Sequence, residues 1–410
     1  MKDNLKWTKS KIFLIVFNCI LCIAIVISAM MIVIDKSRMK NGIVYTDGEP
    51  VTTNSDAQSA TQSARLMCAG ENLVYSSVFS QASNRANSNG YDFSASYNEI
   101  KDIIAKSDLA MVTQSSVMDD KNEPSGSPEF NSPNEILDKF IALGFDVFNQ
   151  ANDHIMDMGL SGAINDIALF KTKENEALLT GLDENREEMI KPHTREVNGI
   201  TFSFVGITES LGGYSLSEDS DIGILDLSDD RSSEDEINGS VKQLITNSKN
   251  ASDIVCVSVH WDIDSSESTQ SNIIEKLLDY GADIIIGTGT HTLQPIEYMK
   301  NSDGEQALVM RSLGDLISAA DTADELLGGI ADITVTKDSA GKTTVTSAKL
   351  IPIVTQYSTD YADIKIIPFA KYTKELAASH GILQNDESFT YDYIEKYYKD
   401  MFKDALEINY

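Results

Sequence analysis

Residues 254–291 read IVCVSVHWDIDSSESTQSNIIEKLLDYGADIIIGTGTH, and this stretch decides the fold class. The apolar runs at 254–259 and 283–287 each predict a buried strand. Between them, apolar residues recur at helical spacing and predict a helix that ends at Gly281. Continuously apolar strands joined by a helix are typical of a parallel sheet covered by helices.

The same alternation continues on both sides of this stretch. Ser132-Pro133-Asn134-Glu135 predicts a capped helix start, and Gly144 predicts the end of that helix. After about residue 330, a hairpin around Asp338 and a final helix at 391–406 are predicted. We therefore expect an α/β protein, a four-layer α/β/β/α sandwich. The predicted strands lie at 65–69, 109–112, 145–149, 201–206, 254–259, 283–287, 307–311, 333–336, 343–347, 349–354 and 364–368.

The N-terminal region predicts a membrane anchor. Residues 12–34 form an apolar run without a charged residue, and its 23 residues span roughly 34 Å as a helix, enough for a bilayer core of about 30 Å. A cleaved signal peptide is the nearest alternative, but its apolar region is usually shorter, and no A-x-A-like site ends this run. We expect a cytoplasmic basic tail at 1–11, one transmembrane helix at 12–34 and a flexible stalk at 35–64.

The charge of the chain is strongly negative and uneven. The 63 Asp and Glu outnumber the 33 Lys and Arg, for a net charge of −30. Residues 1–40 carry seven Lys or Arg and two Asp, a net +5, so the remainder carries −35. This balance argues against binding to nucleic acid. Cys68 and Cys256 fall in apolar predicted strands, so we expect buried thiols rather than a disulfide.

Polar residues directly follow several predicted strands, at the strand ends where α/β sheets form their sites. Carboxylates and imidazoles brought together from separate loops are ligands for Zn²⁺, Mn²⁺ or Fe²⁺. A lone histidine at a strand end is more often structural, so the whole set carries this hypothesis. His193 and His380 are expected at the surface or at a helix end. The candidate residues are Glu71, Asn152, Asp153, His154, His260, Asp262, His291 and Asp315.

The motifs at these strand ends follow one another in a specific order. They are Gly70-Glu71-Asn72-Leu73-Val74, Pro128-Glu129-Phe130-Asn131-Ser132-Pro133, Ala151-Asn152-Asp153-His154 with Asp157 and Gly159, Val257-Ser258-Val259-His260-Trp261, Gln294-Pro295-Ile296-Glu297 and Ser312-Leu313-Gly314.

This order resembles the capsule-synthesis CapA family, whose members are implicated in making or exporting poly-γ-glutamate. The resemblance covers about residues 65–320 and continues weakly to about 380. It implies a metallo-dependent phosphatase (calcineurin-like) fold with two metals at the strand ends. It also implies a single-pass protein with its N-terminus in the cytoplasm and its domain outside the cell. We expect this domain to span 65–380, with a C-terminal helical extension at 381–410.

The resemblance also assigns roles to individual residues. Glu71 and His291 would serve one metal, Asp153 and His260 the other, and His154 would act as general acid or contact a phosphate. Additional site candidates are Asn152, Asp262 and Asp315. The carboxylates of Asp119, Asp262 and Asp264 lie near the motifs in the sequence and could substitute for missing ligands.

Several ligand positions depart from the family's pattern. Glu71 replaces an Asp, Asp153 replaces an Asn, and Gly289 replaces the first histidine of a His-Pro-His motif. Ser115 replaces the Glu that would bridge two metals. Because a shared carboxylate holds two dications together, we expect a single weakly bound divalent metal (Mn²⁺, Zn²⁺ or Fe²⁺) or none.

Three functions fit these expectations. The first is a membrane-anchored extracellular protein of capsule or poly-γ-glutamate synthesis, export or attachment. The second is a metal-dependent phosphoesterase or amide hydrolase of the cell envelope, and the third is a non-catalytic scaffold of a membrane polymer synthase. The expected partners are the capsule polymer or synthase proteins. A domain of charge −35 repels a polyanion, so contact with poly-γ-glutamate requires divalent cations or a local basic patch, and no Lys/Arg run supplies one.

Overall fold

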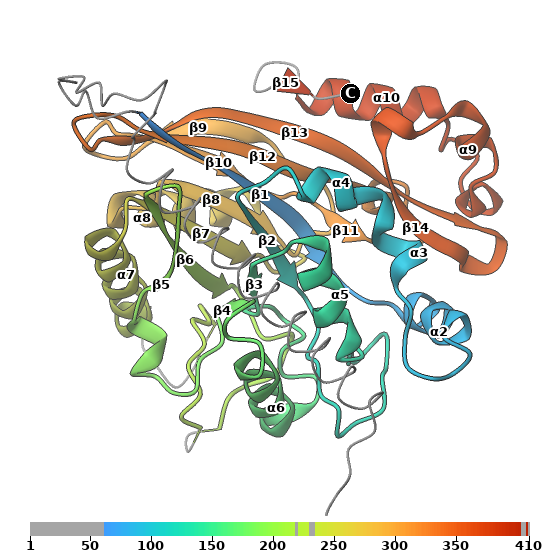
Figure 1. The fold of residues 1–410 in the computed structure, drawn as a ribbon, viewed down its shortest axis with the longest axis horizontal. Helices are drawn as coiled ribbons and strands as arrows, with labels where there is room; N and C mark the ends of the chain where they lie inside the picture. Colours follow the sequence, from blue (N-terminus) through green and yellow to red (C-terminus); the bar gives the residue numbers. More distant parts are fainter. Residues whose placement is uncertain (1–60, 218–219, 229–233, 403–406, 409–410) are drawn as a thin grey trace, which may run out of the picture. The chain divides into compact units, whose positions relative to one another are not determined.

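The computed structural model describes residues 61–217, 220–228, 234–402 and 407–408 (Figure 1). The predicted basic tail and membrane anchor lie outside these residues. Within the described part of the chain, no helix combines the length and the apolar character needed to cross a bilayer.

The larger sheet has β1 near its centre. The strand order is β14-β13-β12-β1-β2-β3-β4, with β11 paired to β1 and β15 paired to β13. β1 runs parallel to β2 and antiparallel to β12. It begins at Gln62, so residues 62–64, which we assigned to the stalk, belong to the sheet. The strands are β1 (Gln62–Asn72), β2 (Leu109–Gln114), β3 (Val147–Asn149), β4 (Leu178–Thr180), β11 (Asp315–Ile317), β12 (Leu327–Lys337), β13 (Thr343–Ser358), β14 (Ala362–Pro368) and β15 (Glu407–Ile408).

The smaller sheet contains the stretch from which the fold class was predicted. Its strand order is β5-β6-β7-β8-β10-β9, and β6, β7, β8 and β10 are parallel. The predicted helix between β7 and β8 is present and ends at Gly281, whose φ is 115°. The strands are β5 (His193–Val197), β6 (Ile200–Thr208), β7 (Ile254–His260), β8 (Ile284–Thr288), β9 (Ile296–Lys300) and β10 (Gln306–Met310).

The two sheets pack face to face. Cys68 of β1 and Cys256 of β7 are buried free thiols, as predicted. The contact with Cys256 and burial raise the pKa of the Cys68 thiol well above its ordinary value. Leu66, Phe204 and Ile286 belong to the same buried cluster. Because neighbouring residues of a strand face opposite sides, the intervening residues of β6, β7 and β8 form a separate core with α7 (Glu234–Ala251) and α8 (Glu267–Tyr280).

Helices also cover the outer face of the larger sheet, so the predicted α/β class with two sheets is confirmed (Figure 1). α5 (Glu135–Leu143) ends at Gly144 as predicted, but the expected capping box does not form. The Ser132 hydroxyl instead lies 2.6 Å from the Ser116 hydroxyl. The remaining helices are α2 (Ser76–Arg85), α3 (Ser94–Tyr97), α4 (Lys101–Ile104), α6 (Gly159–Lys171), α9 (Lys374–Ala378) and α10 (Tyr391–Met401), with short 3₁₀ turns that include η1 (Asn98–Ile100), η2 (Glu188–Ile190) and η6 (Gly381–Gln384).

The C-terminal part adds to the larger sheet. β13 is one continuous strand where two strands were expected. α10 is shorter than the predicted helix, and its Tyr398 hydroxyl donates to the Ile353 carbonyl at 2.6 Å, which holds the helix against β13. β15 then pairs with β13, so the predicted C-terminal extension is not helical throughout.

His380 lies at a helix end, as expected, where it caps η6, but it is buried rather than exposed. Its Nδ1 accepts a hydrogen bond from the Ile382 N–H at 3.1 Å, and its Nε2 lies 2.9 Å from the Thr355 carbonyl. The rings of Tyr357 and Phe389 enclose it, with centroids 4.4 and 4.8 Å away. Burial lowers the pKa of His380 to about 4, because the charged imidazolium would lose its hydration.

The lowered pKa predicts a loss of stability in acid. Between pH 6.5 and pH 4 the unfolded chain takes up a proton at this residue and the folded chain does not, so His380 should reduce the free energy of unfolding by about 3 kcal/mol. His380→Gln should flatten the pH dependence in this window, as measured by urea unfolding at several pH values.

His193→Gln is the matched control. Burial lowers the pKa of His193, but Asp183 raises it by more, so the pKa of His193 lies above its ordinary value. The contribution of His193 to the free energy of unfolding is therefore lost only as the pH rises above 6.5. Between pH 4 and 6.5, His193→Gln should leave the slope of the free energy of unfolding against pH unchanged. Equal slopes in wild type and His380→Gln would contradict the assignment.

Candidate metal centre

The candidate residues converge where the carboxyl ends of parallel strands from both sheets meet. Glu71 lies near the end of β1 and Asp153 follows β3, both in the larger sheet. His260 ends β7 and His291 follows β8 in the smaller sheet. Asp315 begins β11, which pairs with β1 through Glu71. Residues far apart in the sequence are thus brought to one edge by the strand order.

Glu71 lies at the middle of this group and is fully buried. Its Oε1 is 3.2 Å from Nε2 of His260, and its Oε2 is 3.6 Å from Nδ1 of His291. Oε2 also accepts the Gly289 N–H at 3.0 Å. Only glycine fits there, because its φ is 91° and a Cβ atom would lie 2.1 Å from the Trp261 carbonyl oxygen.

The side chains form two groups of three. In each group, one ligand atom from every residue lies within 4.8 Å of the others. The first group is Glu71, Asp153 and His260, and the second is Glu71, His291 and Asp315. Our sequence analysis assigned Glu71 to one group only. The structure places it in both, so the two groups share a carboxylate even though Ser115 is a serine.

The atoms of these groups fit a divalent metal. Within the two ligand groups, the buried polar atoms without a hydrogen-bond partner are Asp153 Oδ1, Asp315 Oδ2 and His260 Nδ1. Buried polar atoms are normally satisfied, so these two carboxylate oxygens have capacity for another ligand, although Asp153 Oδ1 lies 3.5 Å from Nε2 of His260. Each group offers one imidazole and two carboxylates, a donor set suited to Mn²⁺, Fe²⁺ or Zn²⁺.

Burial and close charges shift the titration of this site. Burial raises the pKa of Glu71, but His291 and His260 outweigh it and hold the pKa well below its ordinary value. Burial lowers the pKa of His291, but Asp315 and Glu71 raise it to about 11. Burial also raises the pKa of Asp315 to about 7. Without a metal, the positive charge of a protonated imidazole therefore balances the carboxylates. A bound dication would displace the proton of this imidazole.

His291 has a strained backbone. Its φ is 56°, in the left-handed region that residues other than glycine seldom occupy. This conformation accompanies a contact of 3.0 Å between His291 Nδ1 and Asp315 Oδ1. Such strain is concentrated at functional sites, which agrees with a role for His291 beyond packing.

A histidine–carboxylate pair lies beside the first group. His154 Nδ1 is 2.8 Å from Asp157 Oδ2, and the same oxygen accepts the Phe130 N–H at 2.6 Å. The Phe130 ring packs on the imidazole, with centroids 4.6 Å apart. Asp157 therefore orients the ring so that Nε2 faces Asp153, 3.8 Å from its Oδ1. Our sequence analysis did not include Asp157 among the site residues, although the motif that contains His154 also contains Asp157, three residues later.

The other predicted site residues have different surroundings. The Asn152 side chain binds backbone groups, including the His154 N–H at 2.9 Å, and so shapes this loop. Asp262 accepts the Ser210 hydroxyl at 3.0 Å. Asp119 accepts the Asn165 amide at 2.8 Å. Neither Asp119, Asp262 nor Asp264 belongs to the two ligand groups found among the described residues.

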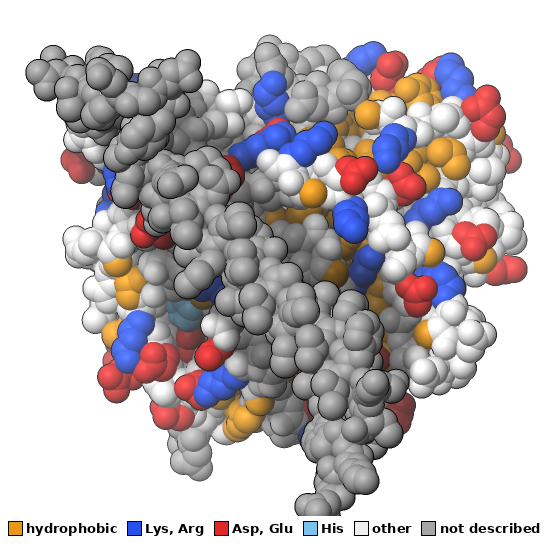
Figure 2. All heavy atoms as spheres, viewed as in Figure 1, with side chains coloured by type: hydrophobic (Ala, Val, Ile, Leu, Met, Phe, Trp, Pro, Cys, Tyr) orange, Lys and Arg blue, Asp and Glu red, His pale blue; other side chains and the backbone are white. Residues whose placement is uncertain are grey.

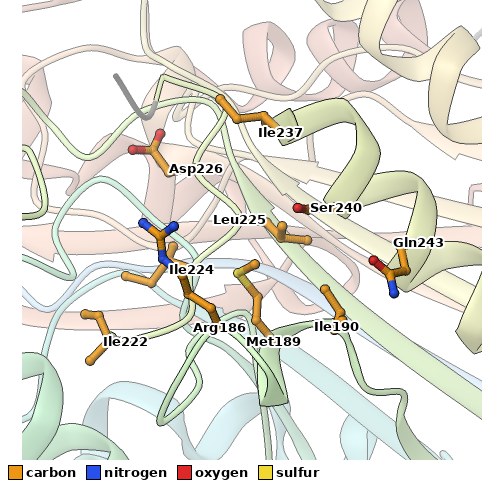
Figure 3. Close-up of a pocket in the computed structure, with 10 residues that line it drawn as sticks. All are labelled: Arg186, Met189, Ile190, Ile222, Ile224, Leu225, Asp226, Ile237, Ser240 and Gln243. Carbon is orange, nitrogen blue, oxygen red and sulfur yellow. The ribbon is translucent and has the colours of Figure 1, made fainter. Parts of the chain in front are cut away.

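A separate pocket of about 180 Å³ lies between α7, η2 and the segment 222–226 (Figure 3). Its lining is mainly aliphatic, and no residue of the two ligand groups contributes to it. The lining residues are Arg186, Met189, Ile190, Ile222, Ile224, Leu225, Asp226, Ile237, Ser240 and Gln243.

Comparison with known proteins identifies relatives. The chain is 28% identical over 177 residues to the capsule biosynthesis protein CapA of Bacillus anthracis, covering 42% of this chain and 40% of the relative. It is 28% identical over 179 residues to the PGA biosynthesis protein CapA of Bacillus subtilis (strain 168), covering 43% of each. The chain thus spans less than half the length of the curated relatives it matches.

One solved structure, a hypothetical protein from Thermus thermophilus, aligns with 70% of this chain and 99% of its own at 14% identity. Its TM-score of 0.41 adds nothing to the assignment. Residues 65–320 match the family described as bacterial capsule synthesis protein PGA_cap, which confirms the resemblance predicted from the strand-end motifs. The chain belongs to this family.

Proposed function

We propose that the protein acts in the synthesis, export or attachment of an acidic capsule polymer, through a divalent-metal centre that supports a hydrolytic step. The observation that carries this proposal is the buried Glu71 carboxylate shared by two ligand groups. The bond that is cleaved would be a phosphoester or an amide of the polymer or its precursor. Family membership supports the capsule polymer as the setting.

Specific residues would hold the metal. Asp153, His260 and Glu71 would form one site, and Glu71, His291 and Asp315 the other. A bound divalent cation supplies a polarised substrate oxygen and a water of lowered pKa. Glu71 would belong to both sites. Because the Gly289 N–H already holds this carboxylate in place, each cation would bind more tightly.

His154 would move the proton in this reaction. Burial lowers the pKa of His154, but Asp157 and Asp153 raise it above its ordinary value, which favours the protonated imidazole. That proton would be given to the leaving group, because Nδ1 is engaged by Asp157. The Phe130 ring packs against the imidazole with the ring planes 59° apart, and the His154 side chain is 18% exposed.

The proposed location is the outer face of the cell membrane. Residues 12–34 would form a single-pass anchor with the N-terminus in the cytoplasm. The strongly acidic chain suits an exported, solvated domain, and membrane proteins of polymer synthesis are the proposed partners.

Metal content tests the shared carboxylate. Purified protein dialysed against trace Mn²⁺, Zn²⁺ and Fe²⁺ should retain about two equivalents in elemental analysis. Glu71→Gln should lose both equivalents, because it removes a ligand from each group, whereas Asp315→Asn should lose one. Glu297→Gln, which removes a half-buried carboxylate paired with Arg311, is the control and should not change the metal content.

A folded wild-type protein without metal would favour the non-catalytic scaffold. In that event, deletion of residues 12–34 should abolish function, and His154→Ala should have no effect.

The orientation of the His154 imidazole can be tested by titration. Asp157→Asn should lower the pKa of His154, because it removes the negative charge 2.8 Å from Nδ1. NMR titration of the imidazole in metal-free protein measures this change directly. Asp262→Asn serves as control, since Asp262 contacts Ser210 rather than His154. An unchanged His154 pKa in Asp157→Asn would refute the proposed orientation.

A further inference from the structure

A groove of about 590 Å³ lies between the helical segment α2–η1 and the edge strand β14, away from the candidate metal centre. Its volume falls within the range of ligand-binding clefts. Its lining residues are Arg85, Ser94, Ala95, Asn98, Glu99, Asp363, Ile364, Lys365, Ile367, Lys371 and Leu376. In Figure 2, Lys and Arg side chains, interspersed with Asp and Glu, gather over the area where Figure 1 places α3, α4 and β14.

The cations of this groove come from distant segments. Gln81 of α2 donates to the Tyr361 carbonyl and accepts the Ile364 N–H at 2.7 and 3.2 Å, so it joins α2 to β14. Arg85 follows one helical turn later, on the same side of α2. On β14, Ile364 is buried, so the alternation of the strand places Lys365 on the open face.

Two of the cations have no carboxylate partner. Lys365 is half-buried and, among the described residues, its side chain makes neither a hydrogen bond nor an ion pair. Arg85 donates only to the Asp92 carbonyl at 2.9 Å and the Ser96 hydroxyl at 3.4 Å. Unpaired cations are notable in a chain whose net charge is −30.

The neighbouring acids cancel only part of this charge. Glu99 is paired with Lys371 at 2.8 Å. The Asp92 carboxylate, which does not line the groove, accepts the Ser94 N–H at 2.9 Å and also interacts electrostatically with Arg85, so it offsets part of the Arg85 charge. Asp363 therefore remains as the one lining carboxylate without an ion pair in the described chain, against two unpaired cations. Over its lining residues alone, the groove therefore has a formal charge of +1, on a chain whose net charge is −30.

We propose that this groove binds the carboxylates of an acidic polymer chain, with Arg85 and Lys365 as the contacts. This inference rests on the proposed function, because the groove supplies the basic patch that an acidic capsule polymer needs. Arg85 offers a planar donor pair that matches a carboxylate, and Lys365 offers a point charge on the other wall. Glutamate side chains of an extended polymer present carboxylates that both walls can contact.

The test uses the full chain in detergent, with EDTA present to exclude binding through metal. The probe is a fluorescent oligomer of ten γ-linked glutamates, followed by anisotropy. Arg85→Gln/Lys365→Gln should bind about tenfold more weakly at low salt, and high salt should weaken binding of the wild type. An unlabelled α-linked glutamate oligomer should compete, and a glutamine oligomer of equal length should not.

Matched variants make the outcome decisive. Arg195→Gln/Lys300→Gln removes the same charges from β5 and β9 of the other sheet and should bind as the wild type does. Lys365→Gln alone removes a side chain without a partner, so its weaker binding cannot reflect unfolding. Equal affinity of the groove and control variants, competition by the glutamine oligomer, or no binding by wild type would overturn the proposal. None of these binding results depends on the metal content of the protein. The proposed function is tested by the metal content, so the two proposals can fail independently.

Discussion

The buried carboxylate of Glu71 is the constraint on which the site depends. An isolated charge in such a position would cost several kcal/mol, and here two imidazoles and one backbone N–H stabilise it. Glu71 comes from the larger sheet, and His260 and His291 come from the smaller one, so this contact joins the two sheets at the edge where their strands end. The same arrangement leaves one oxygen on each of Asp153 and Asp315 without a hydrogen bond.

Much of the fold could be predicted from the sequence, because buried parallel strands are continuously apolar and helices between them end at glycine. The strand, helix and strand predicted within 254–291 are all present. The errors concern contacts that are remote in the sequence. Ser132 binds Ser116 rather than capping α5, and pairing with β12 extends β1 back to Gln62. His380 is buried because aromatic side chains from separate segments enclose it.

The candidate site was less accessible to sequence reasoning. Strand-end position identified the carboxylates and histidines, but it could not show that Glu71 reaches both histidines. Comparison with the family pattern at Ser115 suggested that a shared carboxylate was missing, whereas the geometry supplies one from the neighbouring strand. Asp157 and Gly289 act through a backbone N–H or a ring nitrogen, and such roles depend on loop conformation. The unpaired cations of the groove between α2 and β14 lie on segments remote in sequence, so no run of basic residues marks them.

The central claim is that one carboxylate serves two metal positions. The most direct measurement is anomalous diffraction at the manganese edge from crystals of the protein grown with Mn²⁺. The account predicts two anomalous peaks, each in contact with a different oxygen of Glu71, one also touching His260 and the other His291. Absence of both peaks, with Glu71 still within hydrogen-bonding distance of His260, would contradict the claim and leave the cluster as a structural ion-pair network.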